Sequence, residues 1–477
     1  MLFKHSILYF LARLGPAIIT LLALSVYTRL LTPEDYGFYS LTIVVAMGLN
    51  TIVFQWISLA LGRFLPEVND ARLKKQWVST AVYSWLCIAL IISVATYFLP
   101  LDDYLSQFSV IFSIVGILAA GQGWFALALR FDNIALRPVR YGIASLIKSG
   151  LALLLGGAAL HFGLDVRAVL MMLLIALLLS SLLQRSEWAN SDIRFFDKSI
   201  FIKMLVYGMP LTMTFVMTFL IDASGRFFIA KYQGPAEVGV FSASFEFIQY
   251  IIGTLLGIIH LAAFPLIISK LNKEGEIAAR KQLVINFELL LAVAAASCVG
   301  LALLSADVAA LFMGENFRAG ANTLMPWLAL ALFLSVIRSY YFDYAFQLGS
   351  NTVLQFYTVA VGALVNIIAC IILIPICGLS GAAVAICYGF AASLVTSIVL
   401  GKYAFVMPAL PKLAIVKVAF AICCMVLAIV QLPVLTALWA LILKTLVGGA
   451  VFISVMIMMN YMNVRQLLKE RYFARGA

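Results

Sequence analysis

The stretch PEDYGFYS at residues 33–40 recurs, with substitutions, as PAEVGVFS at residues 235–242. Proline, an acidic residue, glycine, an aromatic residue and serine keep their places at a constant offset of 202 residues, and Arg29 falls opposite Lys231 at the same offset. A Pro-acid-x-Gly sequence also begins helices outside repeats, because proline and glycine favour turns. The eight aligned positions, with matching topology on both sides, favour an internal repeat.

Long apolar runs surround both copies of this motif. Of the 477 residues, 64% are hydrophobic and 11% are charged, and the mean hydropathy is +1.08. Soluble domains are roughly 45–50% apolar and about 25% charged. A hydrophobic excess of this size cannot be buried in one core, so most of the chain must be solvated by lipid. The composition therefore predicts an all-α membrane protein.

The charge and cysteine patterns exclude several other classes. The net charge of +11 lies mainly in short loops between apolar runs, where basic residues set membrane orientation, so no nucleic-acid partner is expected. None of the seven cysteines forms a Cys-x-x-Cys pair, so neither a metal site nor a disulfide framework is expected. No cofactor is expected, and the sequence contains no P-loop motif.

About fourteen apolar runs are long enough to cross a bilayer, which takes about 20 residues. The first run is too long for a signal-peptide core and is read as a retained helix. Two of the runs are separated only by Cys377-Gly378-Leu379, a turn signal that follows Pro375. If these two were one bent element, the total would be thirteen. The runs fall near 7–30, 38–61, 77–99, 108–129, 138–161, 164–183, 203–229, 238–264, 283–304, 325–347, 352–376, 380–400, 412–432 and 436–459.

Basic residues are distributed unequally between the two sides of the predicted membrane domain. With the N-terminus in the cytoplasm, 22 basic residues fall on the cytoplasmic side, near residues 4, 63–75, 130–140, 185–203, 270–281, 402–412 and 465–475. Only Arg29, Arg167, Lys231 and Arg318 fall on the outer side. This bias predicts that both termini are cytoplasmic, which requires an even number of helices and favours fourteen over thirteen.

Six predicted helices separate the two copies of the motif, so both halves of the chain enter the membrane in the same direction. This arrangement predicts a parallel repeat about an axis along the membrane normal, as in transporters with two similar bundles. The predicted parts are an N-lobe at 1–200 with helices one to six, a C-lobe at 201–402 with helices seven to twelve, and a region at 403–477 with two extra helices and a basic cytoplasmic tail.

Two segments, 27–39 and 374–383, resemble the polysaccharide transporter family. These are the Wzx-type flippases of the multidrug/oligosaccharidyl-lipid/polysaccharide (MOP) exporter superfamily. Asn366, eight residues before the second segment, also fits the family pattern. The layout of six, six and two helices extends the resemblance over the whole chain, and it is shared with lipid II flippases.

The resemblance implies a function. Members of the family carry undecaprenyl-pyrophosphate-linked oligosaccharides from the cytoplasmic to the periplasmic leaflet of the bacterial inner membrane, for O-antigen, exopolysaccharide or capsule assembly. They have a MATE-like fold with an often cationic cavity between two lobes, and they work by alternating access. The implied partners are the lipid-linked oligosaccharide, membrane lipid, and a polysaccharide polymerase with other assembly proteins.

Several basic residues lie within or beside the apolar runs, where charge is costly and usually faces a wet interior. A pyrophosphate headgroup requires guanidinium or ammonium donors. Snorkelling to the surface is an alternative for Arg13, and the choice between groove and snorkelling stays open for Lys417 and Lys444. The candidate substrate-binding residues are Arg13, Arg29, Arg63, Lys148, Arg226 and Arg338.

Three acidic residues accompany these cations and make the predicted cavity mixed in charge. Asp222 lies four residues before Arg226, so the two can form a structural pair on one helix face. Asp343 lies five residues after Arg338, a poorer spacing for a pair on an α-helix. Glu246 has no local partner in sequence, so it can be protonated, pair with Arg226, or carry a coupling proton. All three acids are interpreted as coupling or structural groups.

Other functions remain alternatives at this point. A lipid II flippase or a multidrug exporter of the same superfamily would share the layout, although the two extra helices favour a lipid-tailed substrate. A membrane glycan polymerase or glycosyltransferase is the alternative from another class. The pair Asp102-Asp103 could serve a glycosyltransferase, but such a pair at a helix end is typically a solvated turn. Nothing in the sequence resembles a catalytic triad, and no enzyme activity is predicted.

Overall fold

The computed structural model describes residues 2–98, 109–349, 351–433 and 436–463. The chain forms two compact units, Met1–Ala243 and Ser244–Ala477. Within the described residues the chain contains helices and connections but no strand. The all-α membrane fold is therefore confirmed, whereas the division at residues 200 and 402 stays a prediction.

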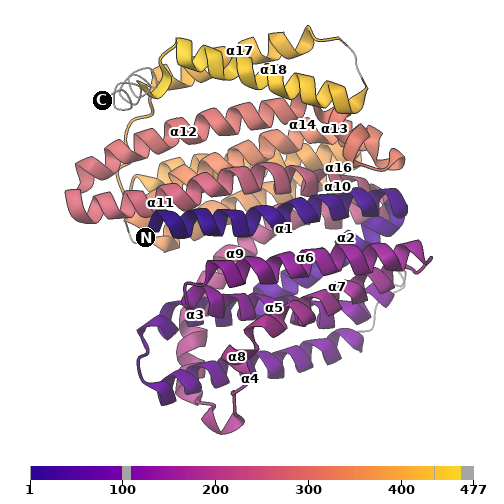
Figure 1. The fold of residues 1–477 in the computed structure, drawn as a ribbon, viewed down its shortest axis with the longest axis vertical. Helices are drawn as coiled ribbons and strands as arrows, with labels where there is room; N and C mark the ends of the chain where they lie inside the picture. Colours follow the sequence, from indigo (N-terminus) through magenta and orange to yellow (C-terminus); the bar gives the residue numbers. More distant parts are fainter. Residues whose placement is uncertain (1, 99–108, 350, 434–435, 464–477) are drawn as a thin grey trace, which may run out of the picture. The chain divides into compact units, whose positions relative to one another are not determined.

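The first unit is a bundle of long helices with short connections. In this unit α1 packs on α6, α6 on α7, α4 on α5, and α3 on α9 (Figure 1). Tyr27 on α1 donates a hydrogen bond to the carbonyl oxygen of Ala152 on α6 at 2.6 Å. The helices are α1 (Leu2–Leu30), α2 (Pro33–Val53), α3 (Gln55–Phe64), α4 (Ala71–Tyr97), α5 (Ser109–Ile134), α6 (Pro138–His161), α7 (Val166–Ser181), α8 (Arg185–Trp188), α9 (Lys198–Gln233) and the start of α10 (Pro235–Ile248).

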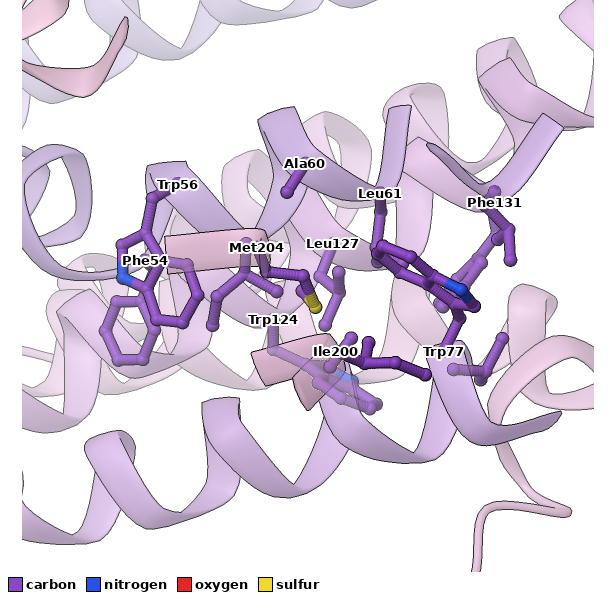
Figure 2. Packing of buried hydrophobic residues seen from close by; sticks show 14 of the residues in the cluster. Phe54, Trp56, Ala60, Leu61, Trp77, Trp124, Leu127, Phe131, Ile200 and Met204 are labelled. Carbon is purple, nitrogen blue, oxygen red and sulfur yellow. The ribbon is translucent and has the colours of Figure 1, made fainter. Parts of the chain in front are cut away.

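An aromatic cluster holds four helices of this unit together. Figure 2 shows Trp56 and Leu61 of α3, Trp77 of α4, Trp124 of α5 and Met204 of α9 packed in one group. All five side chains are at most 8% exposed. Large aromatic side chains contribute much of the packing energy of such cores. The cluster therefore packs α3, on which the predicted site residue Arg63 lies, against α4, α5 and α9.

The repeated motif starts a helix in both halves of the chain. Thr32 accepts a hydrogen bond from the backbone N–H of Asp35 at 3.1 Å, and Pro33 is the first residue of α2. In the second copy, Gly234 ends α9 with a φ of 92°, and Pro235 is the first residue of α10. Proline suits the first helical position because no intrahelical partner is needed for its missing N–H.

The two copies of the motif also meet each other within the first unit. A Cβ atom added to Gly37 would overlap the carbonyl oxygen of Pro235, and one added to Gly239 would overlap that of Pro33. The contact is reciprocal, since each glycine meets the proline of the other copy. Backbone approaches backbone here, so glycine is the residue that fits. The motif thus starts each helix and joins α2 to the beginning of α10.

The second unit contains the remaining helices and two π-helical turns. In this unit α14 packs on α16, α12 on α14 and α17, and α17 on α18 (Figure 1). The elements are the π-turn Gln249–Gly253, α11 (Thr254–Glu274), α12 (Glu276–Leu303), α13 (Ser305–Phe312), α14 (Glu315–Ile337), the π-turn Arg338–Phe342, α15 (Tyr344–Leu348), α16 (Thr352–Gly401), α17 (Lys412–Val430) and α18 (Ala437–Met458).

The predicted turn near residue 378 divides α16 into two arms. Gly378 has a φ of 60° and a ψ of −141°, a backbone conformation that glycine adopts and other residues rarely do. Gly381 packs against the carbonyl group of Leu373, and Gly389 packs against the buried Asn366. Small residues therefore allow the arms to lie against each other, which explains the glycines in and after the 374–383 motif.

The number of apolar helices agrees with the sequence. Twelve helices among the described residues are long and apolar enough to cross a membrane, and Leu14–Leu30 is a shorter apolar helix. The span Val353–Gly401 is counted once there, although Gly378 divides it. With its two arms taken separately, the described residues contain the fourteen apolar helices that the sequence predicts. The chain is a multi-pass membrane protein.

Candidate functional site

A cationic and aromatic group lies where α3, α5 and α9 approach one another in the first unit. We call Arg63, Phe64, Arg130 and Lys203 the α3–α5–α9 cluster. The Lys203 ammonium lies 4.5 Å from the centre of the Phe64 ring, and the Arg63 guanidinium lies 5.9 Å from it. Arg130 donates from Nε to the hydroxyl of Ser58 at 3.0 Å. Two cations, from α3 and α9, thus lie beside the Phe64 ring, and Arg130 of α5 contacts α3 at Ser58.

The cations of this cluster outnumber the acids that neutralise them. Arg63 forms an ion pair with Glu67, and that hydrogen bond raises the pKa of Arg63 above its ordinary value. Among the described residues, Arg130 and Lys203 have no carboxylate partner. Gly62 has no side chain, and the Arg130 guanidinium packs against it. Nη1 of Arg130 lies 3.3 Å from the position that a Cβ atom on residue 62 would occupy. The cluster therefore retains positive charge that a phosphate could neutralise.

Lys148 is a further cation with no carboxylate partner among the described residues. It lies on α6, partly buried, and makes no hydrogen bond or ion pair with any described residue. Its helix packs on α1, where Gly15 lies against Leu146. The side chain of Arg13, also on α1, lies outside the described part of the structure. Arg29 is exposed and lies in the last turn of α1, at the opposite end of this helix from its first turn.

Arg226 lies in a different environment, because its donors are used within the first unit. The side chain is 4% exposed and donates from Nε to the hydroxyl of Ser242 at 3.0 Å. A second donor, Nη1, reaches the backbone carbonyl of Asp222 at 2.9 Å, and the Phe241 ring lies 6.0 Å away. Phe241 and Ser242 belong to the second copy of the repeated motif. Arg226 thus links α9 to the beginning of α10.

The Arg338–Asp343 pair is the principal buried ion pair of the second unit. The two side chains are 3% and 1% exposed, and Arg338 Nε lies 3.7 Å from Asp343 Oδ2. Five residues is a poor spacing for a pair on an α-helix, but the chain forms a π-turn here. The N–H of Asp343 bonds to the carbonyl of Arg338 at 2.8 Å, the five-residue hydrogen bond of a π-helix. This turn brings the two charges together.

Hydroxyl groups of the second arm of α16 complete this pair. Arg338 donates from Nη1 to Ser393 at 2.7 Å, and the Ser397 hydroxyl donates to Asp343 at 2.7 Å. Buried charges are tolerated when they are paired and hydrogen-bonded in this way. The pair therefore fastens the π-turn to α16. A role in ion or proton coupling stays a prediction for Asp343, as it does for Asp222 and for the half-buried Glu246.

The π-turn and the start of α15 also contact α11 and α12. The Tyr340 ring stacks on His260 of α11 at 4.6 Å, and the Tyr344 hydroxyl lies 2.6 Å from His260 Nδ1. Tyr341 packs against Phe287 of α12 at 4.6 Å. π-turns often occur at functional sites. Sequence reasoning identified the two charges of this region but missed His260, because nothing in its spacing indicated the contact.

Another ion pair joins two helices of the second unit. Lys444 on α18 forms an ion pair with Asp307 on α13 at 2.6 Å, which ties the last helix to α13. No group of three or more histidine, cysteine, aspartate or glutamate side chains among the described residues could hold a metal ion. The pair Asp102-Asp103 lies outside the described residues. The Lys444–Asp307 pair thus serves helix packing.

Comparisons with known proteins place this arrangement in a family. Residues 26–322 match the family model described as polysaccharide biosynthesis protein. A search of curated proteins gives no match. Among solved structures, the chain is similar to a lipid II flippase MurJ in an inward closed conformation, with a TM-score of 0.77 and 17% identity. This match covers 97% of the present chain and all of that chain.

Multidrug transporters share the fold less closely. An outward-facing MATE family transporter of the MOP superfamily matches with a TM-score of 0.55 and 14% identity over 84% of this chain and 95% of its own. A MOP superfamily transporter from Pyrococcus furiosus matches with a TM-score of 0.53 and 15% identity over 84% and 94%. The family resemblance seen in the sequence is confirmed. The chain belongs to the polysaccharide biosynthesis protein family and has the fold of MOP-superfamily transporters.

Proposed function

We propose that the protein is a flippase that carries an undecaprenyl-pyrophosphate-linked oligosaccharide from the cytoplasmic to the periplasmic leaflet of the bacterial inner membrane. Both termini then lie in the cytoplasm, and the two six-helix lobes alternate access to the substrate. The family match and the fold shared with a lipid II flippase support this proposal. A polysaccharide polymerase and other assembly proteins would use the product.

The observation that carries the proposal is the difference between two kinds of cation. Arg226 and Arg338 are buried, and each donates two hydrogen bonds to protein acceptors. Lys148, Arg130 and Lys203 have no carboxylate partner among the described residues. Lys148 lies within an apolar helix, where a charge without a partner is costly and typically marks a substrate path. A pyrophosphate would supply the missing negative charge.

The positions of these cations suggest two successive binding positions for the pyrophosphate headgroup. The α3–α5–α9 cluster lies at the end of the unit that also carries the loops predicted to be cytoplasmic, so it is placed to receive the pyrophosphate. Lys148 lies ten residues into α6, about 15 Å along the helix axis. We assign the first contact to Arg130, Arg63 and Lys203 and the deeper contact to Lys148. Arg13 and Arg29 on α1 remain candidates for the same path.

The test uses purified full-length protein in proteoliposomes that contain a labelled polyprenyl-pyrophosphate-linked oligosaccharide. Lys148→Met is expected to lower the initial rate of translocation about 10- to 100-fold, because a charge-assisted hydrogen bond contributes about 1.5–3 kcal/mol. Its thermal stability is expected to stay level or rise, since a lysine without a partner is removed from an apolar helix. An impermeant lectin reports the leaflet of the glycan.

Lys198→Met, at an exposed position of the same unit, is the matched control and is expected to transport at the wild-type rate. Equal rates for Lys148→Met and wild type would remove Lys148 from the path. Proteoliposomes that move no more lipid-linked glycan than empty liposomes would contradict the flippase proposal itself.

A lipid II flippase is the second candidate function. The TM-score of 0.77 with such a protein, against 0.55 for an outward-facing MATE transporter, favours a lipid-tailed substrate over a soluble drug. The same proteoliposomes, loaded with lipid II in place of the oligosaccharide lipid, separate the two. Faster movement of lipid II than of any oligosaccharide lipid would favour this second function.

A further inference from the structure

We propose that the second unit binds a phospholipid with an anionic headgroup in a cavity at the end of α16, as a site separate from the transported substrate. The cavity has a volume of about 420 Å³ and is lined by Phe342, Ser397, Lys402, Val406 and Leu410, among other residues. Ligand pockets typically have volumes of roughly 300–1,000 Å³. The proposal does not depend on which molecule the protein transports.

The cavity exists because the chain stops being helical before it reaches α17. α16 ends at Gly401, and residues 402–411 form no helix before Lys412 begins α17. The N–H groups of Ala404 and Phe405 bond to the carbonyl of Gly401 at 3.0 Å. Gly349 lacks a side chain where the Ala404 carbonyl approaches. This connection therefore lies across the end of α16 and covers the cavity.

The cavity is chemically suited to an amphiphile. Its lining is mostly apolar, and the hydroxyl of Ser397 is already bonded to Asp343. Lys402 is exposed and has no hydrogen bond or ion pair with any described residue, and no acidic residue lines the cavity. Lys412, at the far end of the connection, is likewise exposed and without a partner among the described residues. An acyl chain would fit the apolar wall, with its phosphate near Lys402.

The location favours a lipid over a water-soluble anion. The second arm of α16, from Gly378 to Gly401, is about 35 Å long, which spans a hydrocarbon core of about 30 Å. Lys402 therefore follows the helix at the level of the headgroups. Tyr403 is 78% exposed and Val406 is 59% exposed, as expected for side chains that face an interface. Basic pockets between transmembrane helices on the cytoplasmic side bind anionic headgroups.

The occupied cavity would touch the Arg338–Asp343 network. Phe342 is the last residue of the π-turn, and Ser397 bonds to Asp343. A lipid in the cavity would therefore contact both sides of the link between the π-turn and α16. This position gives the lipid a direct way to stabilise the packing of the second unit.

The test is native mass spectrometry of the full-length protein titrated with phosphatidylglycerol or with phosphatidylcholine of the same chain length. Wild type is expected to retain phosphatidylglycerol in preference to phosphatidylcholine. Lys402→Gln is expected to weaken phosphatidylglycerol binding about fivefold, since a basic residue near an anionic lipid contributes about that factor. Lys402→Arg keeps the charge and is expected to bind as wild type does.

Two further variants separate the site from general surface charge. Lys273→Gln, at another exposed position of the second unit, is expected to bind phosphatidylglycerol as wild type does. Val406→Trp fills the cavity and leaves every charge in place, so it is expected to reduce retention of both lipids. Equal binding by wild type and Lys402→Gln would overturn the proposal. Displacement of phosphatidylglycerol by an equimolar polyprenyl phosphate would overturn it as well and assign the cavity to a substrate tail.

Discussion

Gly37→Ala is expected to reduce the stability of the protein by about 3 kcal/mol or more, although it adds one methyl group. Overpacking usually costs about 1–3 kcal/mol, because neighbouring side chains can adjust. At Gly37 the new Cβ would overlap the backbone carbonyl of Pro235, which belongs to the first turn of α10 and has little freedom to move. Relief would require the separation of α2 from α10. Thermal unfolding of the purified protein measures the effect.

The chain offers matched controls for this substitution. Gly239→Ala is expected to have a similar effect, because its Cβ would overlap the carbonyl of Pro33. Gly150 lies inside α6 with no atom within 4 Å of an added Cβ. Gly150→Ala is therefore expected to stabilise the protein by about 0.5–1 kcal/mol, the usual gain inside a helix. A Gly37→Ala protein as stable as wild type would show that the two copies of the motif do not pack closely.

Asp343→Leu is expected to destabilise the second unit by about 3–5 kcal/mol, because it leaves the buried Arg338 guanidinium without its carboxylate. Arg338→Met is expected to lower the free energy of unfolding by a comparable amount, because it leaves the buried Asp343 carboxylate without its guanidinium. The double variant Arg338→Met/Asp343→Leu removes both charges and should be more stable than either single variant. A double-mutant cycle on thermal unfolding measures this coupling directly.

A variant of the hydroxyl group that binds Arg338 is the control for this double-mutant cycle. Ser393→Ala removes one acceptor of Arg338 but leaves the ion pair, so it is expected to cost about 1–3 kcal/mol. Effects of Arg338→Met and Asp343→Leu that simply add would contradict a coupled pair. Such additivity would leave both charges available for ligand or ion binding in this unit.

The fold could be predicted largely from the sequence, because lipid imposes long apolar runs that need little tertiary information. The turn at Gly378 was also predictable, because glycine and proline interrupt such apolar runs. The close contact between Gly37 and Gly239 was not. The motif shows that glycine recurs, but only the three-dimensional structure shows that the two glycines serve one contact.

The candidate site was predicted in part. Arg63 and Lys148 stand out by their positions, whereas Arg130 and Lys203 were counted only as charges that set orientation. The contacts of Lys203 with Phe64 and of Arg130 with Ser58 depend on the packing of three helices and leave no local signal in the sequence. The pairing of Arg338 with Asp343 depends on a π-turn, which changes the spacing rule that an α-helix would impose.

The central claim is that the protein moves a lipid-linked glycan between leaflets, and one measurement tests it most directly. Cells are depleted of the protein, and the polyprenyl-linked glycan is labelled with an impermeant lectin in intact spheroplasts and in inverted vesicles. We expect complete glycan units to accumulate on the cytoplasmic face, and wild type but not Lys148→Met to restore them to the outer face. Glycan units that still reach the outer face at the normal rate in depleted cells would contradict the account.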